Sequence, residues 1–559
     1  MGILDWIVIG LFAVALIMII VWVSRQKQNS ASDYFLGGKD ATWIAIGASI
    51  FASNIGSEHL IGLAGAGASS GMAMAHWEIQ GWMILILGWV FVPFYSRSMV
   101  YTMPEFLERR YNGASRTILS LISLISYVLT KVAVTVYAGG LVFQQVFGID
   151  TLWGIDFFWI AAIGLVLITA IYTVVGGMKS VLYTSVLQTP ILLLGSLIIL
   201  VLGLRELGGW DEMMRVCSAV TVNDYGDTMT NLIRSNSDPQ YPWLGALIGS
   251  AIIGFWYWCT DQFIVQRVLS GKDEKQARRG TIFGAYLKLL PVFLFLIPGM
   301  IAFALSNQGI VINGEVFHLD TPDAAFPTLV AKLLPAGVKG LIVCGILAAL
   351  MSSLASLFNS SSALFTIDFY KRFNPNTDPK KLVRIGQVAT VVIVLLGIIW
   401  IPVMRSMGDV LYNYLQEVQS VLAPGIAAAF LMGIMWKRTT AQGGMWGLLS
   451  GLIIGLTRLG AKIWFDFNPV EGSHGWFQYL FYDCNWLFFC GWMLLFCVAV
   501  VFIVSMFTKA PEQLKIQGLV FGTSTPEQRK ATRDSWNTWD IIHTVIILGI
   551  TVAFYWYFW

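Results

Sequence analysis

The stretch SIFASNIGSEHLIGL, residues 49–63, interrupts an apolar run that is long enough to cross a lipid bilayer. Polar side chains crowd around Gly56 in its middle, namely Asn54, Ser57, Glu58 and His59. Backbone that leaves helical geometry at membrane depth is tolerated only where it is buried in protein or lines a wet cavity, and polar side chains there mark a substrate or ion path. Because a broken helix also frees carbonyl groups for a cation, we expect a binding site at this break.

The composition is that of a membrane protein. Hydrophobic residues make up 57% of the chain and charged residues 12%, with a mean hydropathy of +0.70, whereas soluble domains carry about 25% charged residues. We therefore predict an all-α polytopic protein whose outer surface contacts the lipid bilayer. A net charge of +3 is too small to suggest a nucleic-acid partner. About fourteen apolar runs have spanning length, and they begin near Leu4, Trp43, Met72, Ile118, Phe157, Val181, Trp243, Ile282, Val338, Ile385, Leu411, Met445, Asn485 and Ile541.

The basic residues predict how the chain is oriented. The first run, residues 6–23, has no basic residue before it and is followed by Arg25 and Lys27, so we interpret it as a retained helix with its N-terminus outside. Fourteen spans then place both termini outside. The segments assigned to the inside hold 25 Lys and Arg residues against 8 outside, as the positive-inside rule requires. We predict a multi-pass protein of the plasma membrane, or of the inner membrane if the source is bacterial.

The two halves of the chain each contain five predicted spans, in residues 41–206 and 243–435. Because five is odd, the second set enters the membrane with the opposite orientation, which is the arithmetic of an inverted repeat with a site at the repeat interface. The predicted organisation is an extra N-terminal helix and inside loop (1–36), a first repeat (37–206), an outside loop (207–242), a second repeat (243–438) and three peripheral helices (439–559).

Further polar side chains lie at membrane depth. Glu78, beside Trp77 and Gln80, is either an interfacial acid or part of a site. The run WYWCTDQ, residues 256–262, is either an interfacial aromatic belt or a second helix break whose rings stack on the apolar faces of a sugar. Lys288 either snorkels to the membrane surface or donates to a substrate hydroxyl.

Two later helices carry neutral oxygen groups. Ser352 and Ser353 offer hard oxygen ligands without charge, which suits a sodium ion that must also be released; packing of small residues is the alternative. Gln416 is both donor and acceptor, although a polar helix start would look the same. No Cys/His metal pattern appears, and Cys217 and Cys484, both predicted outside, could pair, which the sequence alone does not decide.

These residues resemble the solute–sodium symporter family, and within it the sodium/glucose cotransporter branch, over roughly residues 5–510. The resemblance implies the leucine-transporter-type fold, a five-plus-five inverted-repeat core with discontinuous helices, preceded by one helix and followed by three. The matching stretches are FASNIGSEH (51–59), WYWCTDQ (256–262), VQR (265–267), YLKL (286–289), MSSLASLFNS (351–360), YLQ (414–416) and MWKR (435–438).

The family's functional positions carry over to individual residues. Tyr257 matches an inner-gate tyrosine below the sugar. The sodium ligands implied are the carbonyls of Ala52, Ile55 and Ala349 and the hydroxyls of Ser352 and Ser353. The sugar contacts implied are Asn54, His59, Glu78, Tyr257, Trp258, Lys288 and Gln416.

Three positions depart from the family's pattern. Members that couple two sodium ions carry an aspartate and a hydroxyl where this chain has Ser185 and Ala355, so we expect one sodium per sugar. Gly254 stands where relatives often have a side chain able to reach the sugar, which makes the sugar class more certain than the individual sugar.

We therefore expect a monomeric, sodium-coupled secondary active symporter that brings a glucose- or galactose-like monosaccharide into the cell by alternating access. One alternative is a sodium symporter for myo-inositol, sialic acid or an amino acid. Another is a sugar sensor or ion conductor that does not transport. We do not expect an enzyme, because no nucleophile–base or metal constellation appears in the sequence.

Overall fold

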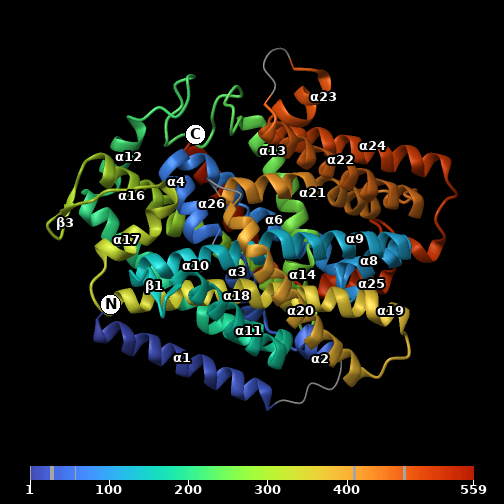
Figure 1. The fold of residues 1–559 in the computed structure, drawn as a ribbon. Helices are drawn as coiled ribbons and strands as arrows, with labels where there is room; N and C mark the ends of the chain where they lie inside the picture. The colour runs from blue at the N-terminus through green and yellow to red at the C-terminus, as the bar shows by residue number, and fades with distance from the viewer. Residues whose placement is uncertain (1, 26–30, 57, 407–410, 470–473) are drawn as a thin grey trace.

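The computed structural model describes residues 2–559 apart from 26–30, 57, 407–410 and 470–473. The architecture is all-α, as predicted (Figure 1). Two small hairpins lie in connections between helices: β1 (Thr151–Leu152) pairs with β2 (Ile155–Asp156), and β3 (Val311–Ile312) pairs with β4 (Glu315–Val316).

Most helices are long and apolar. Within the described residues, eleven stretches are long and apolar enough to cross a membrane, so the protein is a multi-pass membrane protein. Fourteen crossings stay a prediction. The larger helices are α1 (Ile3–Ser24), α3 (Trp43–Asn54), α9 (Gly113–Ser126), α10 (Ala133–Phe147), α11 (Phe157–Leu207), α13 (Trp243–Gly254), α15 (Glu274–Lys288), α16 (Ile297–Asn307), α18 (Val338–Ala363), α20 (Pro379–Ser406), α21 (Leu411–Met435), α22 (Ala441–Phe467), α24 (Trp486–Phe507) and α26 (Thr538–Tyr557).

Shorter helices and π-helical turns connect or interrupt these. The shorter helices are α2 (Ala31–Leu36), α4 (Ala64–Ser70), α5 (Ala75–Glu78), α6 (Gly81–Ile86), α7 (Val92–Ser98), α8 (Met103–Arg110), α12 (Trp210–Ser218), α14 (Gln262–Leu269), α17 (Ala325–Leu333), α19 (Lys371–Phe373), α23 (Trp476–Gln478) and α25 (Pro526–Asp534). The π-helical turns are η2 (Glu58–Leu63), η4 (Leu87–Phe91), η5 (Tyr127–Val132), η6 (Phe255–Thr260), η7 (Val292–Leu296), η9 (Leu364–Tyr370) and η10 (Tyr479–Asp483).

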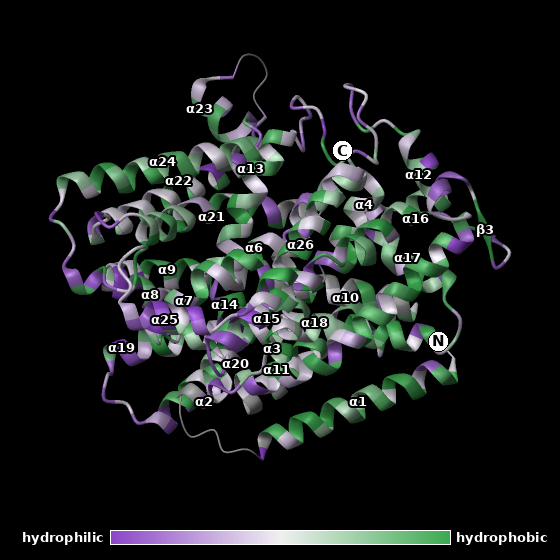
Figure 2. Ribbon diagram, turned by 180° about the vertical axis from the view of Figure 1, so that it is seen from behind, coloured by the Kyte–Doolittle hydropathy of each residue, from purple (hydrophilic) through white to green (hydrophobic). Residues whose placement is uncertain are grey.

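Hydrophobic helices form the outside of the molecule. Figure 2 shows α1 and α24 as largely hydrophobic ribbons, whereas hydrophilic residues gather around α8 and α25 at one end. Trp6, Leu11 and Phe507, on α1 and α24, are 55%, 67% and 88% exposed. Helices whose outward side chains are apolar over a spanning length are typical of a surface in contact with lipid.

Two helices are broken where the sequence predicts it. In the first half, α3 ends at Asn54, Ile55 takes extended backbone angles (φ −79°, ψ 104°), and the chain resumes as η2. In the second half, Asp261 (φ −76°, ψ 129°) separates η6 from α14. The predicted discontinuous helices are therefore confirmed, one in each half. The exact boundaries of the repeats stay predictions.

A third break separates two spans within α11. Gly177 adopts φ 52° and ψ −147°, a conformation that favours glycine. A Cβ at this position would lie 2.5 Å from the carbonyl oxygen of Tyr34, so a side chain would not fit. The sequence predicts separate spans that begin near Phe157 and Val181, and the structure turns between them at Gly177.

Each terminus is fastened to a loop that the sequence assigns to the outside. Near the N-terminus, Asp5 Oδ1 accepts hydrogen bonds from the backbone N–H groups of Gly337 (2.6 Å) and Gly340 (2.8 Å), at the start of α18. Near the C-terminus, the carbonyl of Phe558 accepts from Leu232 N at 2.9 Å, in the loop before α13. Both termini therefore lie beside loops that are predicted to be on the same side of the membrane, the outside.

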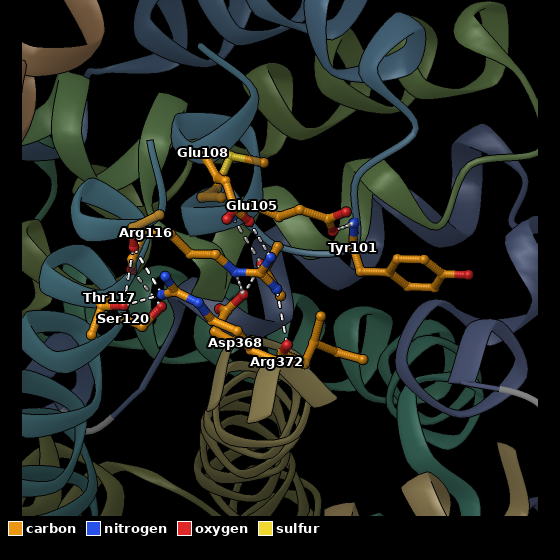
Figure 3. A network of polar contacts seen from close by, with 12 residues as sticks. Tyr101, Glu105, Glu108, Arg116, Thr117, Ser120, Asp368 and Arg372 are labelled. Atoms are coloured by element: carbon orange, nitrogen blue, oxygen red, sulfur yellow. Dashed lines mark hydrogen bonds and ion pairs between the residues drawn. The ribbon is translucent and has the colours of Figure 1, made fainter. Parts of the chain in front are cut away.

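An ion-pair network joins three elements at the opposite end (Figure 3). Arg116 of α9 donates to Asp368 Oδ1 of η9 at 2.8 Å and to Glu108 Oε2 of α8 at 2.5 Å. Thr102, the N-cap of α8, donates to the same Asp368 oxygen at 2.8 Å, and Arg372 donates to the carbonyl of Gly113 at 2.8 Å. This network fixes α8, α9 and η9 relative to one another.

The six cysteines all lie in the described part of the chain, and none of them forms a disulfide there. Cys217 is buried and its Sγ lies 3.9 Å from the carbonyl of Met300, whereas Cys484 lies beside Asn485.

Candidate functional site

Glu78 lies at the centre of a buried polar cluster. Its Oε2 accepts a hydrogen bond from Lys288 Nζ at 2.5 Å and lies 3.3 Å from His59 Nε2. Glu78 ends α5, Lys288 ends α15 and His59 belongs to η2, and none of the three side chains is more than 4% exposed. Burying a charge is costly unless it is paired and hydrogen-bonded, so Glu78 and Lys288 depend on each other.

The broken helix contributes the other side of this cluster. Asn54 Nδ2, at the end of α3, lies 3.3 Å from His59 Nε2. The tautomer in which His59 Nε2–H donates to Glu78 leaves Nδ1 as an acceptor. Among the described residues, Nδ1 is buried and has no hydrogen-bond partner. It is therefore available to a hydroxyl group in the site.

Two aromatic rings from η6 face the same space. Tyr257 and Trp258 pack edge to face, with ring centroids 4.9 Å apart and an angle of 85° between the planes. Lys288 Nζ lies 5.3 Å from the centre of the Trp258 ring, a cation–π contact. The Trp258 indole Nε1–H donates to Gln80 Oε1 at 3.3 Å. The aromatic pair and the ion pair thus form adjoining walls.

Gln416 on α21 also lines the cavity. It is 7% exposed, and its Oε1 has no hydrogen-bond partner among the described residues. The cavity has a volume of about 50 Å³, which corresponds to a few water molecules. All seven residues predicted as sugar contacts line it. Its lining is Asn54, Glu58, His59, Trp77, Glu78, Gln80, Ile253, Gly254, Tyr257, Trp258, Lys288, Leu415, Gln416 and Gln419.

Sequence reasoning did not assign roles to three of the polar lining residues. Gln419 lies one helical turn after Gln416, so helical spacing could have found it. Glu58 lies next to His59 in the quoted stretch, and only its place among the polar residues at the break points to the cavity. Gln80 is two residues from Glu78, a spacing that on a regular helix directs side chains apart. It reaches the cavity because the chain bends at Ile79 and Gln80 between α5 and α6.

The predicted sodium ligands lie between α3 and α18. Ser353 Oγ donates to the carbonyls of Ser53 (3.0 Å) and Ile55 (3.2 Å), and the second of these is a predicted ligand. Ala52 precedes Ile55 by one turn and Ala349 precedes Ser353 by one turn, and all are buried. These are uncharged oxygens; among the described residues, no group of three or more His, Cys, Asp or Glu side chains could hold a metal. Carbonyl and hydroxyl oxygens suit a hard monovalent cation.

Ser352 lies against Ser185, the position at which the resemblance implies an aspartate in members that couple two sodium ions. Its Oγ lies 3.3 Å from Ser185 Oγ of α11, which itself donates to the carbonyl of Val181 at 2.6 Å. Ala355, one turn further along α18, is fully buried and has no side-chain oxygen to offer. Ala355, one of the departures from the family's pattern, lies on α18 together with the paired serines Ser352 and Ser353.

A buried ion pair beside the aromatic wall was not predicted. Lys131 Nζ of η5 lies 2.8 Å from Asp261 Oδ2, at the break before α14, and 4.5 Å from the centre of the Tyr257 ring. The Tyr127 hydroxyl donates to the other oxygen of Asp261. The two charges are 130 residues apart, so no local pattern connects them.

Comparisons with known proteins agree with this architecture. Residues 34–451 match the model of the sodium:solute symporter family. The human sodium/myo-inositol cotransporter 2 is 39% identical over 475 residues, covering 81% of this chain and 69% of that protein. The zebrafish (Danio rerio) sodium/glucose cotransporter 4 is 35% identical over 562 residues, covering 95% of this chain and 83% of that protein.

A solved structure shares the fold. A sodium-coupled sialic acid symporter in a substrate-bound outward-open state superposes with a TM-score of 0.73 at 22% identity, over 91% of this chain and 99% of the other. The leucine-transporter-type fold expected from the resemblance is thus confirmed, and sodium is the coupling ion of the family. The chain belongs to the sodium:solute symporter family and is a sodium-coupled solute symporter.

Proposed function

We propose that the protein couples sodium entry to the uptake of a glucose- or galactose-like monosaccharide. The observation that carries this proposal is the cavity in which a buried ion pair, the Tyr257–Trp258 ring pair, four amides and one imidazole meet. Aromatic faces cover the apolar faces of a sugar ring, while the amide, imidazole, ammonium and carboxylate groups satisfy its hydroxyls. The proposed sugar contacts are Asn54, His59, Glu78, Tyr257, Trp258, Lys288 and Gln416.

The charges of the cavity favour a neutral substrate. Glu78 and Lys288 compensate each other at 2.5 Å, and Glu58 adds a further acid to the lining. A carboxylate-bearing substrate such as sialic acid would need an unpaired cation, because an uncompensated buried charge is unfavourable. Within the described lining, the single cation is Lys288, which Glu78 already binds.

The proposed sodium site explains the coupling. Ala52, Ile55, Ala349, Ser352 and Ser353 would supply the oxygens, and Ile55 belongs to the same break that carries Asn54 and leads to His59. A cation bound between α3 and α18 orders this break and so completes the sugar cavity. The two sites then exchange access together by alternating movement of the helix bundle.

Myo-inositol is the second candidate. The human relative at 39% identity is a sodium/myo-inositol cotransporter, and a cyclic hexol offers the same ring of hydroxyls around an apolar face. Uptake of radiolabelled glucose, galactose, myo-inositol and sialic acid into proteoliposomes, with and without a sodium gradient, separates the candidates. We expect sodium-dependent accumulation of a neutral sugar. If only myo-inositol accumulates, myo-inositol and not a monosaccharide is the substrate. Sodium currents without accumulation would indicate a sensor or conductor.

We place the protein in the plasma membrane as a monomer with both termini outside. The distribution of Lys and Arg residues supports this orientation, and the contacts of both termini with loops of one predicted side are consistent with it. Epitope tags at either end, probed in intact and permeabilised cells, test it: a tag accessible only after permeabilisation would reverse the orientation.

A further inference from the structure

Gly254 leaves a space in the cavity wall that a neighbouring amide fills. It is the last residue of α13, immediately before the turn that carries Tyr257 and Trp258. A Cβ at this position would lie 2.4 Å from Gln80 Oε1, 2.9 Å from its Cδ and 3.0 Å from its Nε2. Real Cβ atoms essentially never come so close to a neighbour, so the carboxamide of Gln80 occupies the volume of a side chain at residue 254.

Hydrogen bonds hold this carboxamide in one orientation. Gln80 Nε2 donates to the carbonyl of Ser250 at 2.8 Å, and Gln80 Oε1 accepts from Trp258 Nε1 at 3.3 Å. The side chain is 2% exposed. An amide has two N–H donors and two acceptor lone pairs, so one of each remains after these bonds. Gln80 lines the same cavity as Glu78 and Lys288.

We propose that Gln80 is a substrate-contacting residue that determines which polyol is selected, and that Gly254 is the small residue that lets it enter the cavity. The remaining N–H and lone pair of the amide bind one hydroxyl of a neutral polyol. This inference rests on the proposed function, since it names a contact and a specificity determinant within the same site. In this role the Gln80 amide determines which arrangement of substrate hydroxyls is bound, which a purely structural residue would not do.

The inference can be tested with variants that shorten the side chain at residue 80 and enlarge the one at residue 254. In Gly254→Ala the methyl group displaces the Gln80 amide, and we expect the KM of the preferred sugar to rise roughly tenfold, as for the loss of about one buried hydrogen bond. Gln80→Asn withdraws the amide by one methylene and has a similar effect. The double variant Gln80→Asn/Gly254→Ala refits the two, and its KM falls below that of either single variant because the two residues share one volume.

Deoxy sugars then identify the contact. A site built to bind a hydroxyl rejects the analogue that lacks it, so the wild-type protein discriminates against each deoxy sugar whose missing hydroxyl is bound. In Gln80→Asn, discrimination at one hydroxyl disappears while discrimination at the others persists. Gly460→Ala is the matched control, since Gly460 lies in α22 with nothing within 4 Å of its Cβ position. Surface abundance and the sodium concentration for half-maximal uptake are measured for every variant.

The outcomes separate this inference from the proposed function. If the wild-type protein accumulates no neutral polyol, the proposed function fails. If it does, but Gln80→Asn lowers affinity for all deoxy sugars equally or behaves like Gly460→Ala, Gln80 is not a specificity determinant. Additive effects in the double variant would also overturn the inference, because they would mean that Gly254 and Gln80 act independently. Should Gly254→Ala fail to reach the membrane, Gln80→Asn with the deoxy series decides alone.

Discussion

Lys288 Nζ lies 2.5 Å from Glu78 Oε2, and both side chains are almost completely buried, at 4% and 2% exposure. The two residues are 210 positions apart and end helices in different halves of the chain, α5 and α15. Their pairing joins the two halves directly at the proposed sugar cavity. Any movement that separates the halves there must either carry the pair along or give each charge a new partner.

Replacing one member of this pair should therefore be worse than replacing both. We expect Lys288→Met to abolish sugar uptake and to destabilise the protein by about 3–5 kcal/mol, because a buried carboxylate loses its partner. The double variant Glu78→Gln/Lys288→Met should recover most of the stability but little of the sugar affinity. Thermal unfolding in detergent and uptake in proteoliposomes measure the two effects.

The partly exposed pair between Lys462 and Glu417 provides the control. Its atoms are 2.6 Å apart, but the side chains are 28% and 34% exposed, and such pairs contribute about 0–1 kcal/mol. Lys462→Met should therefore change the melting temperature little. Equal destabilisation by Lys462→Met and Lys288→Met would contradict the dependence on burial.

Gln416→Ala should weaken sugar uptake and leave sodium activation nearly unchanged. Its buried Oε1 has no protein partner among the described residues, so we expect it to bond a sugar hydroxyl. Losing one such bond costs about 1–3 kcal/mol, which appears as a higher KM for sugar. An unchanged KM for every sugar in the panel would remove Gln416 from the proposed site.

Ser353→Ala should raise the sodium concentration needed for half-maximal uptake, because the proposed site loses one oxygen ligand. Neither lithium nor potassium should restore uptake. Ser362→Ala is the matched control on the same helix, since Ser362 Oγ donates to the carbonyl of Gly386 at 2.6 Å and lies outside the proposed site. If both variants activate at the wild-type sodium concentration, the paired serines serve only to pack α18.

We expect one sodium per sugar. Ser185 and Ala355 leave a second buried sodium without a carboxylate in this region, and the desolvation of a lone ion is costly. A membrane potential of about 100 mV contributes roughly 2.3 kcal/mol per charge, and a tenfold sodium gradient contributes about 1.4 kcal/mol. One ion therefore supports a sugar ratio of about 500-fold, and two ions would square it. Reversal potentials at stepped sugar gradients give the ratio directly, and a shift that matches two sodium ions would contradict the prediction.

The contribution of Asp323 to stability should fall as the pH rises from about 4 to 6. Burial raises the pKa of Asp323 from 3.8 to about 6; this residue lies between α16 and α17, directly over Gly65 of α4. The folded state thus binds more protons than the unfolded state in that window, so stability is lost as the pH rises. Asp323→Asn should recover about 1–3 kcal/mol at pH 7 and change little at pH 4. Asp320→Asn, at a side chain that is 87% exposed, should have no such pH-dependent effect on the melting temperature.

The features that are predictable from the sequence are those written into consecutive residues. The break at Gly56, the turn at Gly177 and the second break at Asp261 each follow from polar or glycine residues inside an apolar run, because lipid tolerates no exposed irregular backbone. The seven proposed sugar contacts were assigned to positions by resemblance, and the structure brings them to one cavity.

Features that depend on distant pairing were not predictable. Lys131 and Asp261 each look like an isolated charge in an apolar segment, and only the packing of η5 against the second break shows that they are partners. The entry of Gln80 into the cavity depends on a bend after Glu78 and on a missing side chain at residue 254. A single sequence does not record either relationship, since neither is periodic nor local.

The contact of Asp5 with the start of α18 has a consequence for biosynthesis. The first N–H groups of a helix need acceptors from elsewhere, and α18 has no local side-chain cap. Its acceptor is Asp5, a residue translated 332 positions before Gly337. The helix that carries Asp5 is therefore translated long before the helix that bears Ser352 and Ser353, and the terminus of the later helix is complete only once the two have packed together. The helix that carries the proposed ion ligands thus has its first turn completed by a carboxylate from a helix made much earlier.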